Sequence, residues 1–309
     1  FDVLFPNIYP LPASGIPPFG TGLRPARAVF GRWRDIALNR LVERLWDRGL
    51  DGLNALRGRS GLPPLARFLD QARRARRQLV LTSETFDFPG TLPPSARYVG
   101  PVLIDPAWAE AASWTPPPGR APLVLVAMSS TFQDQTASLE RVIEALGTLP
   151  VRGLVTTGPA IDAAALRAAA NVTVVASAPH REVLEQAALV VTHGGHGTVM
   201  KALAAGVPMV VLPHGRDQAD NAARVTARGA GVMVKRGARP AAIADAVVRV
   251  LRDDSYRVAA RRLGDAVRRD AQGDTLIREL EAIPRLSRRT HETTIDPCLN
   301  VQDGIRRHA

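Results

Sequence analysis

The segment "VVTHGGHGTVMKALAAG" (residues 190–206) joins an apolar run to a run of good helix formers through a turn rich in glycine. Val190 and Val191 are typical of the end of a buried strand, and residues 199–205 are typical of a helix. Glycines at 194, 195 and 197 let the chain turn sharply and bring unblocked backbone N–H groups close to a ligand. A junction between a strand and a helix also directs the positive end of a helix dipole at that place. The sequence therefore predicts a turn that binds an anion.

On both sides of this turn, apolar runs alternate with helical patterns between residues 122 and 283. Strands that are apolar throughout and alternate with helices predict a parallel sheet covered on both faces, which is a doubly wound α/β domain. Ligands of such domains bind at the carboxyl ends of the strands. The sequence places four polar segments at those ends: "SSTFQD" (129–134), "SAPH" (177–180), "HGGHGT" (193–198) and "PHGRDQADN" (213–221).

The amino-terminal third of the chain has a different pattern. Residues 1–22 are rich in proline and glycine, so we expect an irregular loop there. Helical spacing predicts a helix over residues 32–56, with Trp33 and Trp46 in the core, and a second helix over 65–77. Short strands are expected at 78–83 and from residue 97. The dense prolines of residues 101–121 predict a linker, and residues 286–309 have the composition of a disordered tail.

The charge of the chain is unevenly distributed. The formal net charge is +11, and residues 24–77 hold 14 arginines against five acidic residues. This stretch lacks the interleaved aromatic residues of a base-stacking surface, so it favours a solvated helical face and no nucleic-acid partner. A single cysteine, Cys298, excludes an intrachain disulfide and fits a reducing compartment, and no apolar run is long enough to span a bilayer. We expect a soluble, cytoplasmic protein.

Several of these segments together resemble a known family. "LVLVAMSSTFQDQ" (123–135), "APHREVL" (178–184) and "VVTHGGHGTVMKALAAGVPMVVLPHGRDQADNAARV" (190–225) are similar to the nucleotide-sugar half of the UDP-glycosyltransferase superfamily, in its bacterial macrolide or antibiotic-tailoring branch. The resemblance implies the GT-B fold and inverting transfer of a hexose from a UDP- or dTDP-sugar to a hydroxyl of a small lipophilic acceptor, either a natural product or a lipid. It also implies three segments: residues 1–100 as part of an acceptor-binding domain, 101–121 as the linker, and 122–285 as the Rossmann-like nucleotide-sugar domain.

The resemblance assigns the diphosphate to the glycine-rich turn. His193 and the amides near Gly195, Gly197 and Thr198 are expected to meet the negative charge of the leaving nucleotide, which can replace a metal ion. Ser129 and Thr131 are expected to add hydroxyl donors, although ordinary helix capping explains such residues equally well. No cofactor is expected apart from the donor substrate.

The resemblance also assigns the base and the sugar of the donor. The backbone of Ala178, Pro179 and His180 is expected to pair with the edge of the base. The alternative for the side chain of His180 is that it only caps the next helix. Asp217 and Gln218, with Asn221 after them, match the residues that bind donor-sugar hydroxyls in the family. The structural alternative is that Asp217 merely favours a helix N-terminus.

Two features limit the comparison with the family. Lys201 stands where plant relatives have a glutamate for the ribose hydroxyls, so both UDP and dTDP remain open. Four histidines, at 180, 193, 196 and 214, raise the possibility of a metal site, but their spacing matches no compact zinc signature and no metal is expected.

The general base of the family, an early histidine oriented by an acid, has no match in this sequence. We expect it upstream of Phe1, in an amino-terminal part that is missing from a fragment. One alternative is an inactive nucleotide-sugar-binding or accessory protein derived from the same family. Another is the related group of cell-wall GlcNAc transferases and sugar-nucleotide epimerases, which the segment "GRDQADN" makes less favoured. Peripheral contact with a membrane through the acceptor domain stays open, and neither the acceptor, the sugar nor the oligomeric state follows from the sequence.

Overall fold

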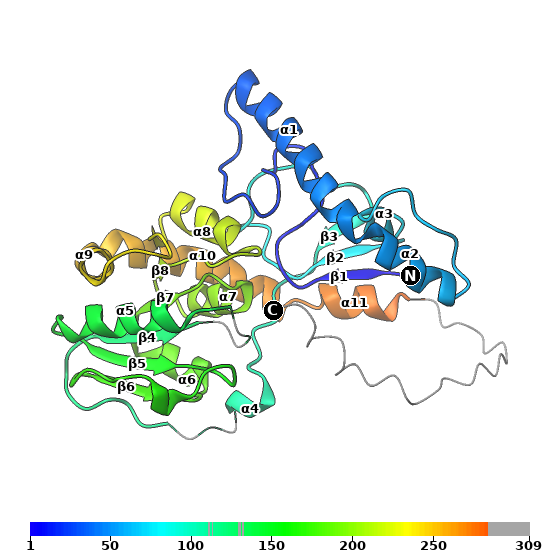
Figure 1. Ribbon diagram of the computed structural model, residues 1–309. Coiled ribbons are helices and arrows are strands. Elements are labelled where there is room, and N and C mark those ends of the chain that lie inside the picture. Colours follow the sequence, from blue (N-terminus) through cyan, green and yellow to red (C-terminus); the bar gives the residue numbers. More distant parts are fainter. Residues whose placement is uncertain (111, 113, 129–130, 132, 284–309) are drawn as a thin grey trace. The chain divides into compact units, whose positions relative to one another are not determined.

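The computed structural model describes residues 1–283, except 111, 113, 129–130 and 132 (Figure 1). Residues Phe1–Leu276 form one compact unit, and a second unit begins at Ile277. The predicted tail, residues 286–309, lies outside the described residues. None of the described helices is both long enough and apolar enough to cross a membrane.

The second half of the chain forms the predicted doubly wound sheet, whose strands run parallel in the order β6-β5-β4-β7-β8-β9 (Figure 1). The strands are β4 (Leu123–Ala127), β5 (Arg152–Thr156), β6 (Val172–Val175), β7 (Ala187–Thr192), β8 (Met209–Val211) and β9 (Gly231–Met233). Numbered within the domain, this is the order 3-2-1-4-5-6, with the switch point between β4 and β7. The predicted fold class is confirmed.

Helices cover both faces of this sheet. They are α5 (Thr136–Gly147), α6 (His180–Gln186), α7 (His196–Ala204), α8 (Gln218–Ala227), α9 (Pro240–Arg252) and α10 (Asp254–Gln272). Alternate residues of β4 enter two different cores: Leu123 and Leu125 pack with residues of α6, α7, α8 and α10, while Val124 and Val126 pack mainly with residues of α5 and α9. Both faces of the inner strands β5, β4, β7 and β8 are buried, which is why these strands are largely apolar.

The first hundred residues contain a second, three-stranded parallel sheet in the order β1-β2-β3. Its strands are β1 (Val3–Phe5), β2 (Gln78–Val80) and β3 (Ala96–Tyr98). The prediction that residues 1–22 hold no regular structure was wrong, because β1 pairs with a strand more than seventy residues later in the chain. A three-residue strand among prolines has no periodicity that a sequence pattern could detect.

The helices of this region are α1 (Val29–Trp46), α2 (Leu50–Arg59) and α3 (Asp70–Arg73), with a short 3₁₀ turn between α1 and α2. The predicted helix over 65–77 is thus a single turn, and the predicted linker holds a further short helix, α4 (Ala107–Glu110). The last described helix is α11 (Thr275–Glu281).

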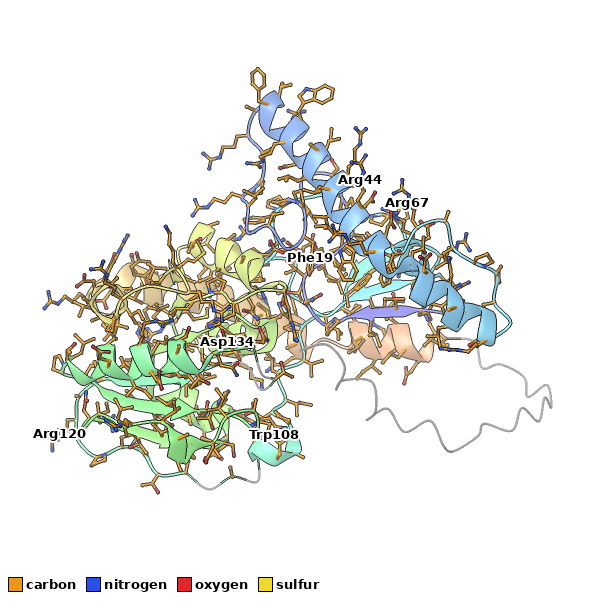
Figure 2. The ribbon with its side chains drawn as sticks, in the orientation of Figure 1. Phe19, Arg44, Arg67, Trp108, Arg120 and Asp134 are labelled. Atoms are coloured by element: carbon orange, nitrogen blue, oxygen red, sulfur yellow. The ribbon has the colours of Figure 1, made fainter. Side chains whose placement is uncertain are left out.

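The expected burial of the two tryptophans on the first helix was wrong. Trp33 is 66% exposed and Trp46 is 43% exposed, and no residue of α1 is buried. Arginines interrupt the apolar face, and Arg44 projects away from α1 (Figure 2). Helical spacing predicted the helix, but burial also needs an opposing surface, which spacing cannot reveal.

Buried contacts tie residues of the first hundred to the doubly wound domain within the same compact unit. Ile8 and Phe86 belong to the core on the α7 side of the large sheet. The carboxylate of Asp87 pairs with the guanidinium of Arg224 on α8 at 2.7 Å, and both side chains are almost fully buried. The ring of Phe88 lies 4.5 Å from the same guanidinium.

Candidate functional site

A cavity of about 340 Å³ lies at the carboxyl ends of the strands of the large sheet. Its walls come from residues that follow β4, β6, β7 and β8, and Thr156 at the end of β5 joins them. This is the edge at which ligands of doubly wound domains bind. Trp108, on the short helix α4 outside the sheet, also lines the cavity. Figure 2 labels this residue.

Most of the residues predicted to bind a donor line this cavity. They are Thr131, Ala178, His180, His193, Gly195, Gly197, Thr198, Asp217 and Gln218. Two others do not line it: Pro179 lies on the wall of a neighbouring cavity, and Asn221 is fully buried behind the site. Ser129 lies outside the described residues.

The glycine-rich turn has a different role at each glycine. Gly194 has φ +90°, and a Cβ there would lie 2.7 Å from Cγ1 of Val211. A Cβ on Gly195 would lie 2.4 Å from Nε2 of His193. Packing alone therefore requires glycine at both positions. At Gly197, by contrast, a Cβ would meet nothing within 4 Å, so this glycine borders open space in the cavity wall.

Helix α7 starts at His196, three residues earlier than the sequence pattern indicated. Its first intrahelical hydrogen bond runs from the N–H of Val199 to the carbonyl of Gly195. The N–H groups of the first turn, from His196 to Thr198, have no partner within the helix. Because Gly197 and Thr198 line the cavity, the positive end of α7 is directed at it.

The imidazole of His193 is buried in the cavity wall. Burial lowers its pKa to about 4, and the charge of Arg216 contributes to the decrease. Its ring is close to the hydroxyl of Thr192 and to the backbone carbonyl of Ala127. At neutral pH His193 is therefore uncharged, and its single ring N–H faces the backbone carbonyl of Ala127.

The loop before α8 is held by side chains of its own sequence motif. The Oε1 of Gln218 accepts hydrogen bonds from the backbone N–H groups of His214 and Gly215, and its Nε2 donates to Gln133. All polar atoms of this amide are thus engaged inside the protein. These contacts position the loop and use one of the two N–H donors of the amide, so the expectation that Gln218 binds a sugar hydroxyl stays a prediction.

Asp217 differs from Gln218 because its carboxylate faces the cavity. It occupies the N-cap position of α8, but its side chain makes no capping hydrogen bond. One oxygen accepts a hydrogen bond from Nδ2 of Asn221 at 2.9 Å, and the same Nδ2 donates to the carbonyl of Gly194. Asn221 therefore connects the glycine-rich turn to Asp217 and keeps both on the same side of the site.

The cavity wall also contains an ion pair that the sequence did not reveal. Asp105, from the predicted linker, pairs with the ammonium group of Lys201 on α7 and accepts a hydrogen bond from the N–H of Arg181 at 3.1 Å. Both charged side chains are largely buried. Close to them, the hydroxyl of Thr156 lies 3.1 Å from Nε2 of His180. No sequence pattern marks Asp105, because it lies in a segment without periodicity.

Arg216 is a second cavity residue that the sequence did not indicate. It lies between Gly215 and Asp217 and lines the cavity. Its φ is +55°, a left-handed conformation that only one other non-glycine residue, Asp134, adopts in the described part of the chain. Among the described residues, no group of three or more histidine, cysteine or carboxylate side chains is placed to hold a metal ion.

Comparisons with known proteins agree with this architecture. Residues 132–283 match the family described as erythromycin biosynthesis protein CIII-like, C-terminal domain. The chain is 34% identical over 278 residues to a 4'-demethylrebeccamycin synthase of Lentzea aerocolonigenes, and the alignment covers 87% of this chain and 66% of that protein.

Solved structures show the same fold. The glycotransferase of kitacinnamycin superposes with a TM-score of 0.66 and 26% identity, over 82% of this chain and 66% of the other. A spinosyn rhamnosyltransferase complexed with thymidine diphosphate shares the fold, with a TM-score of 0.51, 24% identity, and coverage of 74% and 70%. This chain spans about two thirds of the length of these relatives. The chain belongs to the macrolide and antibiotic glycosyltransferase family, with an erythromycin biosynthesis protein CIII-like C-terminal domain and the GT-B fold.

Proposed function

We propose that the cavity binds the nucleoside diphosphate of an activated sugar, and that the protein transfers the hexose with inversion to a hydroxyl of a small lipophilic acceptor. The observation that carries this proposal is the convergence of the first turn of α7, His193 and Asp217 on one cavity at the switch point of the sheet. A donor of this class has an anionic part for the helix N-terminus and a hydroxylated part for the carboxylate.

The first turn of α7 supplies the electrostatic part of the proposed reaction. When the bond between the sugar and the diphosphate breaks, negative charge increases on the departing diphosphate. Fixed N–H dipoles at Gly197 and Thr198 stabilise that charge without rearranging, and removing one such donor from an enzyme typically costs about 10²–10³ in kcat. Neutral His193 lines the same part of the cavity and adds no positive charge of its own.

Asp217 is our candidate for binding the hydroxyls of the sugar. A carboxylate held by Asn221 and not used as a helix cap has lone pairs available for donors in the cavity. Gln218 and Asn221 contribute by holding the loops, so their proposed role is to position Asp217 and the glycine-rich turn.

The nucleoside is proposed to lie near Ala178 and His180, beside the pair formed by Asp105 and Lys201. The base is not identified, and both uridine and thymidine diphosphates fit this proposal. The complex of the spinosyn enzyme with thymidine diphosphate makes that nucleotide a natural first probe. We assign no general base among the described residues and propose that it belongs to a segment preceding Phe1.

The test is calorimetric titration of the 309-residue chain with UDP and with dTDP. Binding of either nucleotide, abolished by Thr198→Pro, which removes an N–H at the start of α7, supports the proposal. Absence of heat with both nucleotides over a range of temperatures refutes it. An accessory protein would bind a nucleotide in the same way, so a transfer assay on the chain extended upstream by its own reading frame distinguishes the two: no transfer there favours the accessory function.

A further inference from the structure

The cavity contains few positive charges for an anionic ligand. Lys201 and Arg216 are the only lysine or arginine residues that line it within the described part of the chain. The ammonium group of Lys201 is already paired with the carboxylate of Asp105. His193 is neutral because it is buried. Arg216 is therefore the one cation in the cavity wall whose charge is not neutralised by a recorded ion pair.

The guanidinium of Arg216 forms no hydrogen bond or salt bridge with the other described residues. The neighbouring carboxylate of Asp217 does not pair with Arg216; it accepts a hydrogen bond from Nδ2 of Asn221. The charge of Arg216 is nevertheless close enough to His193 to lower the pKa of that imidazole. Arg216 thus lies within electrostatic reach of the diphosphate end of the cavity, where His193 and the first turn of α7 meet.

The backbone at Arg216 has an unfavourable conformation for an arginine. A non-glycine residue at φ +55° is strained, and such residues concentrate at functional sites where the surrounding structure holds them. The loop is held by Gln218, which accepts from His214 and Gly215 immediately before Arg216. Glycine or asparagine would adopt this conformation at lower cost, so the chain retains arginine in spite of the strain.

We propose that Arg216 binds the diphosphate group of the nucleotide donor and supplies the positive charge that the rest of the cavity lacks. This inference rests on the proposed function, because it names the residue that recognises the anionic part of the same ligand. A planar guanidinium can form two parallel hydrogen bonds to phosphate oxygens, which suits it to this task.

The experiment compares four proteins by calorimetry: the unaltered chain, Arg216→Asn, Arg216→Gly and Arg216→Lys. Each is titrated with dTDP, with UDP and with the phosphate-free nucleosides. Asparagine and glycine tolerate the left-handed backbone, so both variants should be folded and melt no lower than the unaltered chain while losing the charge. We expect both to bind the preferred diphosphate roughly 10- to 100-fold more weakly, as for the loss of a charge-assisted hydrogen bond.

The remaining variant and probes test the assignment further. Arg216→Lys should retain part of the affinity, since it keeps the charge but loses the two-pronged geometry. Nucleoside binding should be unchanged in all variants, and the dependence of diphosphate affinity on salt should be weaker in Arg216→Asn.

Unchanged diphosphate affinity in both Arg216→Asn and Arg216→Gly would overturn the inference while leaving the proposed function in place. Equal loss for nucleosides and diphosphates would also overturn it, since the effect would then be structural. If the unaltered chain binds no nucleotide, the proposed function itself fails.

Discussion

Replacement of Gly197 by alanine separates binding from folding in the proposed donor site. A Cβ at this position meets nothing within 4 Å, so the folded chain accommodates the methyl group without a clash. Gly197 is the second residue of α7, and replacing glycine by alanine within a helix favours the helix by up to about 1 kcal/mol. We therefore expect Gly197→Ala to be as stable as the unaltered chain or slightly more stable.

The same methyl group would occupy the space through which a diphosphate approaches the N–H groups of α7. Loss of one hydrogen bond to a charged group costs about 1.5–3 kcal/mol, which corresponds to a roughly 10- to 100-fold weaker nucleotide affinity. Calorimetry with UDP and dTDP measures the affinity, and urea unfolding measures the stability.

Gly52→Ala provides a matched control. Gly52 lies in α2 and is also surrounded by open space, so it should gain similar stability and leave nucleotide binding unchanged. Gly195→Ala provides the opposite control, because its Cβ would clash with His193 and should cost about 1–3 kcal/mol of folding free energy. If Gly197→Ala binds the nucleotide as tightly as the unaltered chain, the diphosphate does not approach α7 at this residue and our placement of the ligand is wrong.

Two further predictions concern buried charges. His193 is protonated near pH 6.5 in the unfolded chain and near pH 4 in the folded chain. The stability that this residue contributes is therefore complete above pH 6.5 and decreases by about 3 kcal/mol as the pH falls to 4. His193→Gln should remove this share of the pH dependence in urea titrations, and an unchanged pH profile would contradict the prediction. Asp87→Ala leaves the buried guanidinium of Arg224 without its carboxylate partner and should lower the free energy of unfolding by about 3–5 kcal/mol. Adding Arg224→Met to the same chain should restore part of the lost stability. A loss under about 1 kcal/mol in Asp87→Ala would show that the pair is dispensable.

The doubly wound domain could be predicted from sequence because its signal is local and repeated. The inner strands are largely apolar runs that alternate with helical patterns, so element type, order and parallel direction followed from general rules. The same rules fail for β1, where three residues acquire their structure from a distant partner strand. They also fail for the exposure of Trp33, since an amphipathic pattern predicts a helix but does not identify the surface that covers it.

The candidate site was predictable to the extent that its residues belong to contiguous motifs. Gly197, Thr198 and Asp217 line the cavity as the strand-end rule indicated. Asp105 and Arg216 were not found, for different reasons. Asp105 reaches the site from an aperiodic proline-rich segment, and only the fold brings it to Lys201. Arg216 lies within the motif itself, but its proposed role rests on a left-handed backbone conformation and on the lack of an ion pair among the described residues. Neither feature can be predicted from the sequence pattern.

A match to a family motif does not distinguish residues that touch a ligand from residues that hold those that do. Asn221 and Gln218 match the family as well as Asp217 does, yet Asn221 is fully buried and the amide of Gln218 bonds to its own loop and to Gln133. Asn221 bonds to the carbonyl of Gly194 and to the carboxylate of Asp217, so one side chain fixes the distance between the two binding loops. A substitution there would displace both loops together, which explains how a residue with no access to the ligand can belong to the same motif as residues that line the cavity.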